Sequence, residues 1–113
     1  MPNAMNYMKE ISLALLLTGA GTVLAADPEY TLTIRNHTFE PAELRVPAGK
    51  KIRLTIDNQD PSAEEFESHE LNREKIVPGK SKAAIYVGPL DPGRYPFFGD
   101  FNPALTRGVL IAE

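Results

Sequence analysis

The chain contains no cysteine and no tryptophan, and its three methionines are Met1, Met5 and Met8. Without cysteine, no disulfide can stabilise the fold, and no thiolate can bind a metal ion or act as a nucleophile. The thioether ligands are likewise confined to the extreme N-terminus. A metal site elsewhere in the chain must therefore be built from oxygen and nitrogen donors.

Other absences narrow the functional classes. The basic residues are scattered without forming a stripe, and the formal net charge is −3, which argues against a nucleic-acid partner. The sequence has no glycine-rich phosphate loop and no nucleophile elbow. A chain this short also leaves little room for a deep substrate cleft. These features favour a binding protein over an enzyme.

The N-terminal 25 residues have the features of a secretory signal peptide. Lys9 precedes the almost wholly apolar run Ile11–Leu17, and Val23-Leu24-Ala25 provides small or compact residues at a cleavage site. We therefore predict a signal peptide over residues 1–25, cleavage near Ala25 or Ala26, and a mature domain over residues 27–113. This predicts a periplasmic protein. The alternative is an uncleaved N-terminal anchor, although the apolar stretch is short for a membrane helix.

The mature chain is predicted to be all-β, as a single small β-sandwich. Nine of the ten prolines lie in residues 27–113, nearly all between short apolar runs, and they exclude long helices there. Alternation of apolar and polar residues, or a continuous apolar run in the last case, predicts strands separated by Gly/Pro turns. A helical turn is plausible only over Glu67–Glu74. The expected strands are Tyr30–Ile34, Leu44–Val46, Ile52–Ile56, Lys82–Val87, Tyr95–Phe98 and Gly108–Ala112.

The segment Glu64–Glu70 places four carboxylates and one of the two histidines, His69, within seven residues. Carboxylate oxygens combined with imidazole nitrogen suit iron, manganese or cupric copper. In an extended segment Glu65 and Glu67 would share one face, whereas Phe66 would point to the core. The segment therefore predicts a metal site, with a solvated acidic surface as the alternative.

The order of these segments resembles the cupredoxin superfamily, whose fold is a Greek-key β-sandwich. More narrowly, it resembles the EfeO-type cupredoxin-like domains of periplasmic iron-uptake systems, which work with an iron permease. The superfamily resemblance is carried by His37-x-Phe39-x-Pro41-Ala42, by Leu44-x-Val46-Pro47-Ala48-Gly49, and by Leu90-x-Pro92-Gly93-x-Tyr95-x-Phe97. The narrower one is carried by Glu64–Ser68, Arg73–Lys75, Pro78–Lys80 and Pro96–Phe101.

The departures from the blue-copper pattern are decisive for the chemistry. A type 1 copper site uses two histidines, a cysteine thiolate and a weak axial methionine. The resemblance places Glu64 where the family has its first histidine. The loop Gly99–Thr106, which would carry the other ligands, has no Cys, His or Met. The resemblance therefore implies a cupredoxin without type 1 copper.

A different metal site is expected at the same end of the sandwich. The strands flanking the Pro47–Gly49 turn are expected to be antiparallel neighbours, which places His37 at the end that carries the Asn58–Glu64 loop. Asp100 joins them if the cupredoxin topology holds, and His69 is expected to lie further away. The candidate metal ligands are thus His37, Glu64, Glu65, Glu67, Asp100 and His69.

Two functional classes remain open. The first is a periplasmic protein that binds an iron or copper ion and assists iron uptake, with a ferroxidase-like role left open. Its partners would be the metal ion and an iron permease or periplasmic iron-binding protein. It would contact the membrane only through that partner, as a monomer or weak dimer. The second is a metal-free β-sandwich that binds a transporter or periplasmic partner.

Overall fold

The computed structural model describes residues 26–113, so the predicted signal peptide lies outside the described residues. The part described is all-β and contains no helix that could span a membrane. Its nine strands are β1 (Glu29–Arg35), β2 (Thr38–Glu40), β3 (Glu43–Val46), β4 (Ile52–Asn58), β5 (Glu64–Ser68), β6 (Arg73–Val77), β7 (Ser81–Val87), β8 (Gly93–Gly99) and β9 (Arg107–Ala112).

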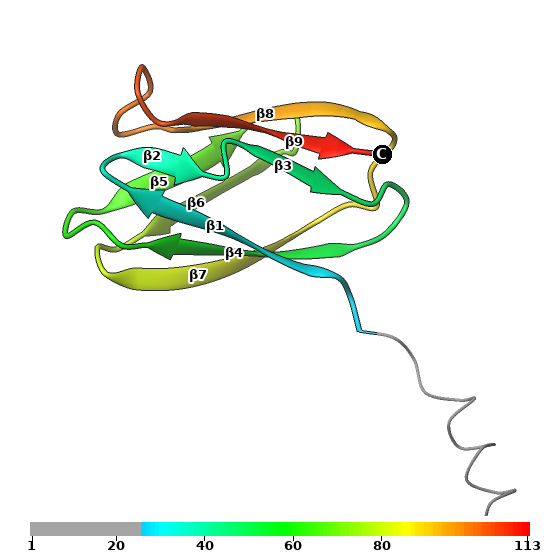
Figure 1. Ribbon diagram of the computed structural model, residues 1–113, viewed down its shortest axis with the longest axis horizontal. Coiled ribbons are helices and arrows are strands. Elements are labelled where there is room, and N and C mark those ends of the chain that lie inside the picture. Colours follow the sequence, from blue (N-terminus) through cyan, green and yellow to red (C-terminus); the bar gives the residue numbers. More distant parts are fainter. Residues whose placement is uncertain (1–25) are drawn as a thin grey trace, which may run out of the picture.

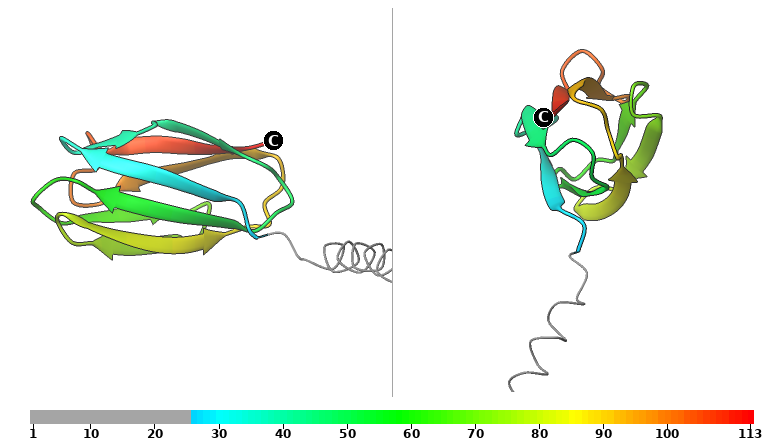
Figure 2. Two further views of the ribbon diagram at one scale, coloured as in Figure 1. Left: turned by 60° about the horizontal axis from the view of Figure 1, so that its bottom comes forward. Right: turned by 90° about the vertical axis from the view of Figure 1, so that its right-hand side faces the viewer.

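The strands form two sheets that pack face to face, as predicted for a β-sandwich (Figure 1). The first sheet has the order β2-β1-β4-β7 and the second the order β3-β9-β8-β5-β6. Both are mixed, because β1 pairs with β4 and β3 pairs with β9 in parallel, whereas the other pairs are antiparallel. Seen nearly along the strands, the two sheets enclose the core on opposite sides (Figure 2, right).

The core follows from the alternation in the strands. In β4 every second residue is buried, so Ile52, Leu54 and Ile56 point inward while Arg53 and Thr55 point outward. The rings of Phe39 on β2, Phe66 on β5 and Phe97 on β8 pack against one another between the two sheets. Phe97 lies 4.9 Å from Phe39 and 5.3 Å from Phe66, measured between ring centroids. Burial of such rings is a major source of stability in a small domain without disulfides.

Two expectations about the fold are wrong. No helical turn forms over Glu67–Glu74: β5 ends at Ser68, a turn follows, and β6 begins at Arg73. The strand β6 has little apolar alternation, with four of its five residues exposed, and it is held by its antiparallel pairing with β5. The strands β3 and β4 are also not paired neighbours, because the chain passes between the two sheets at the Pro47–Gly49 turn.

Four connections gather at one end of the sandwich, on the left in Figure 1: β1–β2, β4–β5, β6–β7 and β8–β9. We call this the loop end. The predicted position of His37 at the same end as the Asn58–Glu64 loop is confirmed, although for a different reason. The Asp60 carboxylate accepts hydrogen bonds from the backbone N–H groups of Asn36 and His37, at 2.7 and 2.9 Å.

Candidate metal centre

The strand β5 divides the acidic segment between two environments. Glu64, Phe66 and Ser68 are buried, whereas Glu65 and Glu67 are half-buried and lie on the outer face of the five-stranded sheet. The prediction that Glu65 and Glu67 share a face while Phe66 enters the core is confirmed. The carboxylates of Glu64 and Glu65, which are adjacent in the sequence, therefore lie on opposite faces of the sheet.

Three carboxylates meet on the outer side. One oxygen each of Glu65, Glu67 and Asp100 lies within 4.8 Å of the others, and we call this set the acidic group. Asp100 is held there by its backbone N–H, which donates to the Glu65 carbonyl at 2.8 Å just after β8 ends at Gly99. Three converging carboxylates form a donor set suited to a hard cation.

In the described part of the chain, no lysine or arginine pairs with the acidic group to relieve its internal repulsion. Glu74 adds to the negative charge, because β6 places it directly opposite Glu67. Burial, together with the hydrogen bond and charge of Asp100 and the charges of Glu67 and Glu74, raises the pKa of Glu65 above 4.5. A bound cation would remove this penalty.

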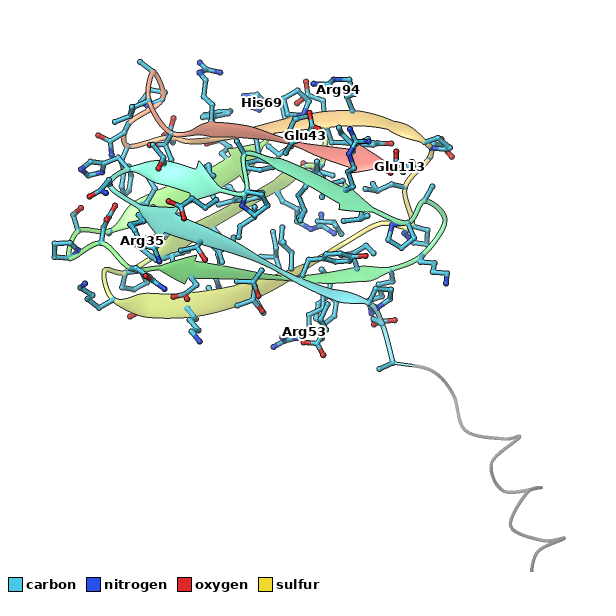
Figure 3. All side chains as sticks on the ribbon, viewed as in Figure 1. Arg35, Glu43, Arg53, His69, Arg94 and Glu113 are labelled. Carbon is cyan, nitrogen blue, oxygen red and sulfur yellow. The ribbon has the colours of Figure 1, made fainter. Side chains whose placement is uncertain are left out.

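His69 lies beside the acidic group. Its Nδ1 is 3.7 Å from Glu67 Oε2, and its ring centroid is 5.5 Å from that of Phe98. The contact with Glu67 was not predicted, although His69 does lie further from the loop end, as expected. Its side chain is 75% exposed, and Figure 3 shows it along the sandwich rather than at the loop end. It does not belong to the acidic group itself.

Glu64 belongs to a separate set of contacts at the loop end. Its Oε1 accepts hydrogen bonds from the backbone N–H groups of Glu65 and Phe101, both at 2.9 Å, and its Oε2 accepts one from Asn102 Nδ2 at 2.8 Å. The residue is only 2% exposed. A buried carboxylate of this kind is stabilised by its hydrogen-bond donors, and these already occupy both of its oxygens.

His37 extends this set of contacts. Its Nδ1 lies 3.5 Å from Asn102 Nδ2 and 3.8 Å from Asp60 Oδ2, and its carbonyl accepts a hydrogen bond from the Thr106 hydroxyl. We call Asp60, Glu64, Asn102 and Thr106, together with His37, the end network. Of the six predicted ligands, the structure brings together Glu65, Glu67 and Asp100, with His69 beside them. His37 and Glu64 lie in the end network.

The electrostatics of Asp60 fit a structural role. Burial on its own raises the pKa of Asp60. The hydrogen bonds from His37 and Asn36 and the positive charges of His37 and Lys80 outweigh burial and hold that pKa below 3.8. The Asn36 and His37 backbones are left-handed, with φ of 54° and 60°, in a tight turn that leaves both N–H groups pointing at one carboxylate.

Neither set of residues fits a type 1 copper centre. The chain has no cysteine, and residues 26–113 contain no methionine, so both sulfur ligands are missing. An all-carboxylate donor set with one nearby imidazole fits iron, manganese or cupric copper instead. The donor chemistry predicted from the sequence is thus present, but from fewer residues than expected.

Sequence analysis missed Asp60, Asn102 and Thr106 as members of the site. Their contacts join segments far apart in the chain: Asn102 and Glu64 are 38 residues apart, and Asn102 and His37 are 65 apart. A polar residue in an apolar loop, such as Asn102 between Phe101 and Pro103, was the only available signal.

The fold is shared with solved structures of low sequence similarity. Auracyanin B has a TM-score of 0.67 and 13% identity, and the match covers 80% of this chain and 93% of that one. The metal-binding domain of the copper(I)-exporting P-type ATPase of Streptococcus pneumoniae D39, solved with Cu(I), has a TM-score of 0.66 and 17% identity, covering 80% and 91%. At these identities the likeness shows the fold alone.

Sequence comparison provides the family. An uncharacterized protein of Rickettsia prowazekii (strain Madrid E) is 47% identical over 85 residues, which are 75% of this chain and 68% of that protein. The family model described as "Cupredoxin-like domain" matches residues 10–112. The chain therefore belongs to the cupredoxin-like domain family.

Proposed function

We propose that this protein is a periplasmic, cupredoxin-like metal-binding protein that carries an iron or copper ion at the acidic group and assists an iron-uptake system. The convergence of Glu65, Glu67 and Asp100 is the observation that carries this proposal. The ion would be held by these three carboxylates, within reach of His69. When bound, it would supply a redox-active centre without sulfur ligands.

Three further points support the proposal. The segments Glu64–Ser68 and Pro96–Phe101 resemble EfeO-type domains of iron-permease systems. The structural neighbours include a domain solved with Cu(I), so this fold can hold a metal ion. The predicted signal peptide over residues 1–25 would deliver the protein to the periplasm, where an iron permease or an iron-binding protein would be its partner.

Metal titration of the purified mature protein tests the proposal. Fe²⁺ under anaerobic conditions, Mn²⁺ and Cu²⁺ should each be titrated by calorimetry. We expect binding tighter than millimolar, and a loss of about tenfold in affinity for Glu65→Gln or Glu67→Gln, which corresponds to about 1.4 kcal/mol. Glu70→Gln is the matched control, because it removes the same charge from an exposed turn position. Binding no tighter than millimolar would contradict the proposal.

A metal-free docking module is the second candidate, and one observation favours it. Phe101 and Leu105, on the β8–β9 loop, are 49% and 55% exposed, so an apolar tip stands at the loop end. A photo-crosslinker at position 101, with an iron permease co-produced in the same cells, would give a permease adduct under this function. The adduct should form equally with Glu67→Gln, which leaves the tip unchanged.

A further inference from the structure

Glu64 has the environment of a positioning residue. It is among the largest fully enclosed side chains of residues 26–113, and both carboxylate oxygens accept hydrogen bonds from close donors. Within the same residues, no buried side-chain nitrogen or oxygen is left without a partner. A metal ion at Glu64 would have to compete with donors that already bind both oxygens of a side chain that is almost fully enclosed.

Two of the three donors come from the β8–β9 loop. These are the Phe101 N–H and the Asn102 side-chain amide, from the two residues that directly follow Asp100. The loop is fitted closely around the carboxylate. A Cβ at Gly99 would lie 2.7 Å from Glu64 Cδ, so any larger residue at position 99 would force a neighbouring side chain to shift. Asp100 thus stands between two residues whose placement depends on Glu64.

The rest of the loop closes on itself. The Gly99 N–H donates to the Thr106 carbonyl at 2.7 Å, and the Leu105 and Thr106 N–H groups both donate to the Asn102 carbonyl. Asn102 therefore joins the rest of the loop to Glu64, beside the backbone contact of Phe101. A hydrogen bond from Asn102 to a buried, charged carboxylate is stronger than a neutral one and fixes its direction.

We infer that Glu64 holds the β8–β9 loop, and through it Asp100, beside Glu65 and Glu67, and that Glu64 is not a metal ligand. The inference deepens the proposed function, because Asp100 is the one member of the acidic group that does not lie on β5. The resemblance places the family's first histidine, a metal ligand, at position 64. Under this inference, Glu64 instead positions the loop that carries Asp100.

A reciprocal exchange tests this inference. In Glu64→Gln the new amide group can still accept the two backbone N–H groups through its oxygen. Its NH₂ then meets the Asn102 amide, which must turn over to present its oxygen and so loses its contact with His37 Nδ1. In Asn102→Asp two carboxylates face each other. The double variant Glu64→Gln/Asn102→Asp restores a donor opposite an acceptor and leaves the total charge unchanged. Glu70→Gln serves again as the charge-matched control.

The first readout is hydrogen exchange of the Phe101 amide without metal, with the Leu54 amide in the core as the measure of global stability. We expect each single variant to raise Phe101 exchange by about tenfold relative to Leu54, and the double variant to return it to within about threefold of wild type. Unchanged Phe101 exchange in both single variants, or failure of the double variant to recover, would overturn the positioning role. This outcome does not depend on metal binding.

The second readout is affinity for Mn²⁺. We expect both single variants to bind more weakly and the double variant to recover. If Glu64 were a ligand, the double variant would stay about tenfold weaker, or Asn102→Asp would bind more tightly than wild type by adding a carboxylate. Either result would overturn the inference. A wild type that binds no Mn²⁺, Fe²⁺ or Cu²⁺ would refute the proposed function, whereas the exchange result would still decide whether Glu64 holds the loop.

Discussion

Glu64 and Glu65 are adjacent in the chain and chemically equivalent side chains, yet they have opposite environments. Glu64 is 2% exposed and its oxygens face three donors. Glu65 lies on the outer face among Glu67, Asp100 and Glu74, all negative. The pleat of β5 alone produces this difference, because successive side chains point to opposite faces. Removing the charge of Glu64 should therefore destabilise the end network. Removing the charge of Glu65 should instead reduce the repulsion within the acidic group.

The largest effect is expected from Glu64→Ala. It leaves the N–H groups of Glu65 and Phe101 and the Asn102 amide without their acceptor and opens a cavity at the loop end. We expect a loss of about 3 kcal/mol in the free energy of unfolding, measured by urea denaturation. Glu67→Ala on the outer face should change it by no more than about 0.5 kcal/mol. Equal losses for the two variants would contradict the contrast.

Gly99→Ala tests the close fit around Glu64. The new methyl group would lie 2.7 Å from both Glu64 Cδ and Thr106 Cγ2, so the loop must shift. We expect a loss of about 2 kcal/mol in the free energy of unfolding. Gly93→Ala is the matched control on the same strand, because the nearest atom to its methyl group would be 3.7 Å away. An unchanged free energy of unfolding in Gly99→Ala would show that the loop is not held tightly.

The pH dependence of stability should separate the two regions further. Because the pKa of Asp60 is lower in the folded protein than 3.8, its contribution to stability is present above pH 3.8 and is lost as pH falls through the folded pKa. In Asp60→Asn this acid-dependent part should disappear, with a loss of about 1 kcal/mol at pH 7. Urea denaturation between pH 2 and 7 measures it. Parallel pH profiles for wild type and variant would contradict this assignment.

Glu65 should behave in the opposite way. Its pKa is raised above 4.5 in the folded state, so stability is lost as pH rises from 4.5 through the folded pKa. Without metal, Glu65→Gln should therefore be a few tenths of a kcal/mol more stable than wild type at pH 7 and no more stable at pH 3.5. With saturating Mn²⁺ the order should reverse, because the variant loses a ligand. A destabilised metal-free variant at pH 7 would contradict the repulsion argument.

The sequence predicted most of what depends on local alternation. The β-sandwich, the central strands and the shared face of Glu65 and Glu67 follow from period-two patterns such as that of Ile52–Ile56. The strand β6 was missed because Arg73–Val77 carries mostly polar, exposed residues and is specified by its partner β5. The acidic segment therefore indicated the region of the candidate site.

The sequence did not predict that the candidate residues are divided between the acidic group and the end network. This division depends on contacts between residues that are far apart in the chain. The partner of Glu64 is Asn102, and His37 is joined to Thr106 through its own carbonyl. Neither contact produces a periodic pattern of apolar and polar residues in the sequence. The contact between His69 and Glu67 was not predicted either, because it depends on the turn of the β5–β6 hairpin, which brings the two side chains together.

Paramagnetic broadening by Mn²⁺ tests the central claim most directly, because it locates the ion. Substoichiometric Mn²⁺ should broaden the backbone amide signals of Glu65, Glu67 and Asp100 before those of Asn36, Gln59 and Thr106. Glu65→Gln/Glu67→Gln should abolish this broadening, and His37→Asn should preserve it. Broadening centred on the end network, loss of broadening in His37→Asn, or no broadening at millimolar Mn²⁺ would contradict the assignment of metal binding to the acidic group.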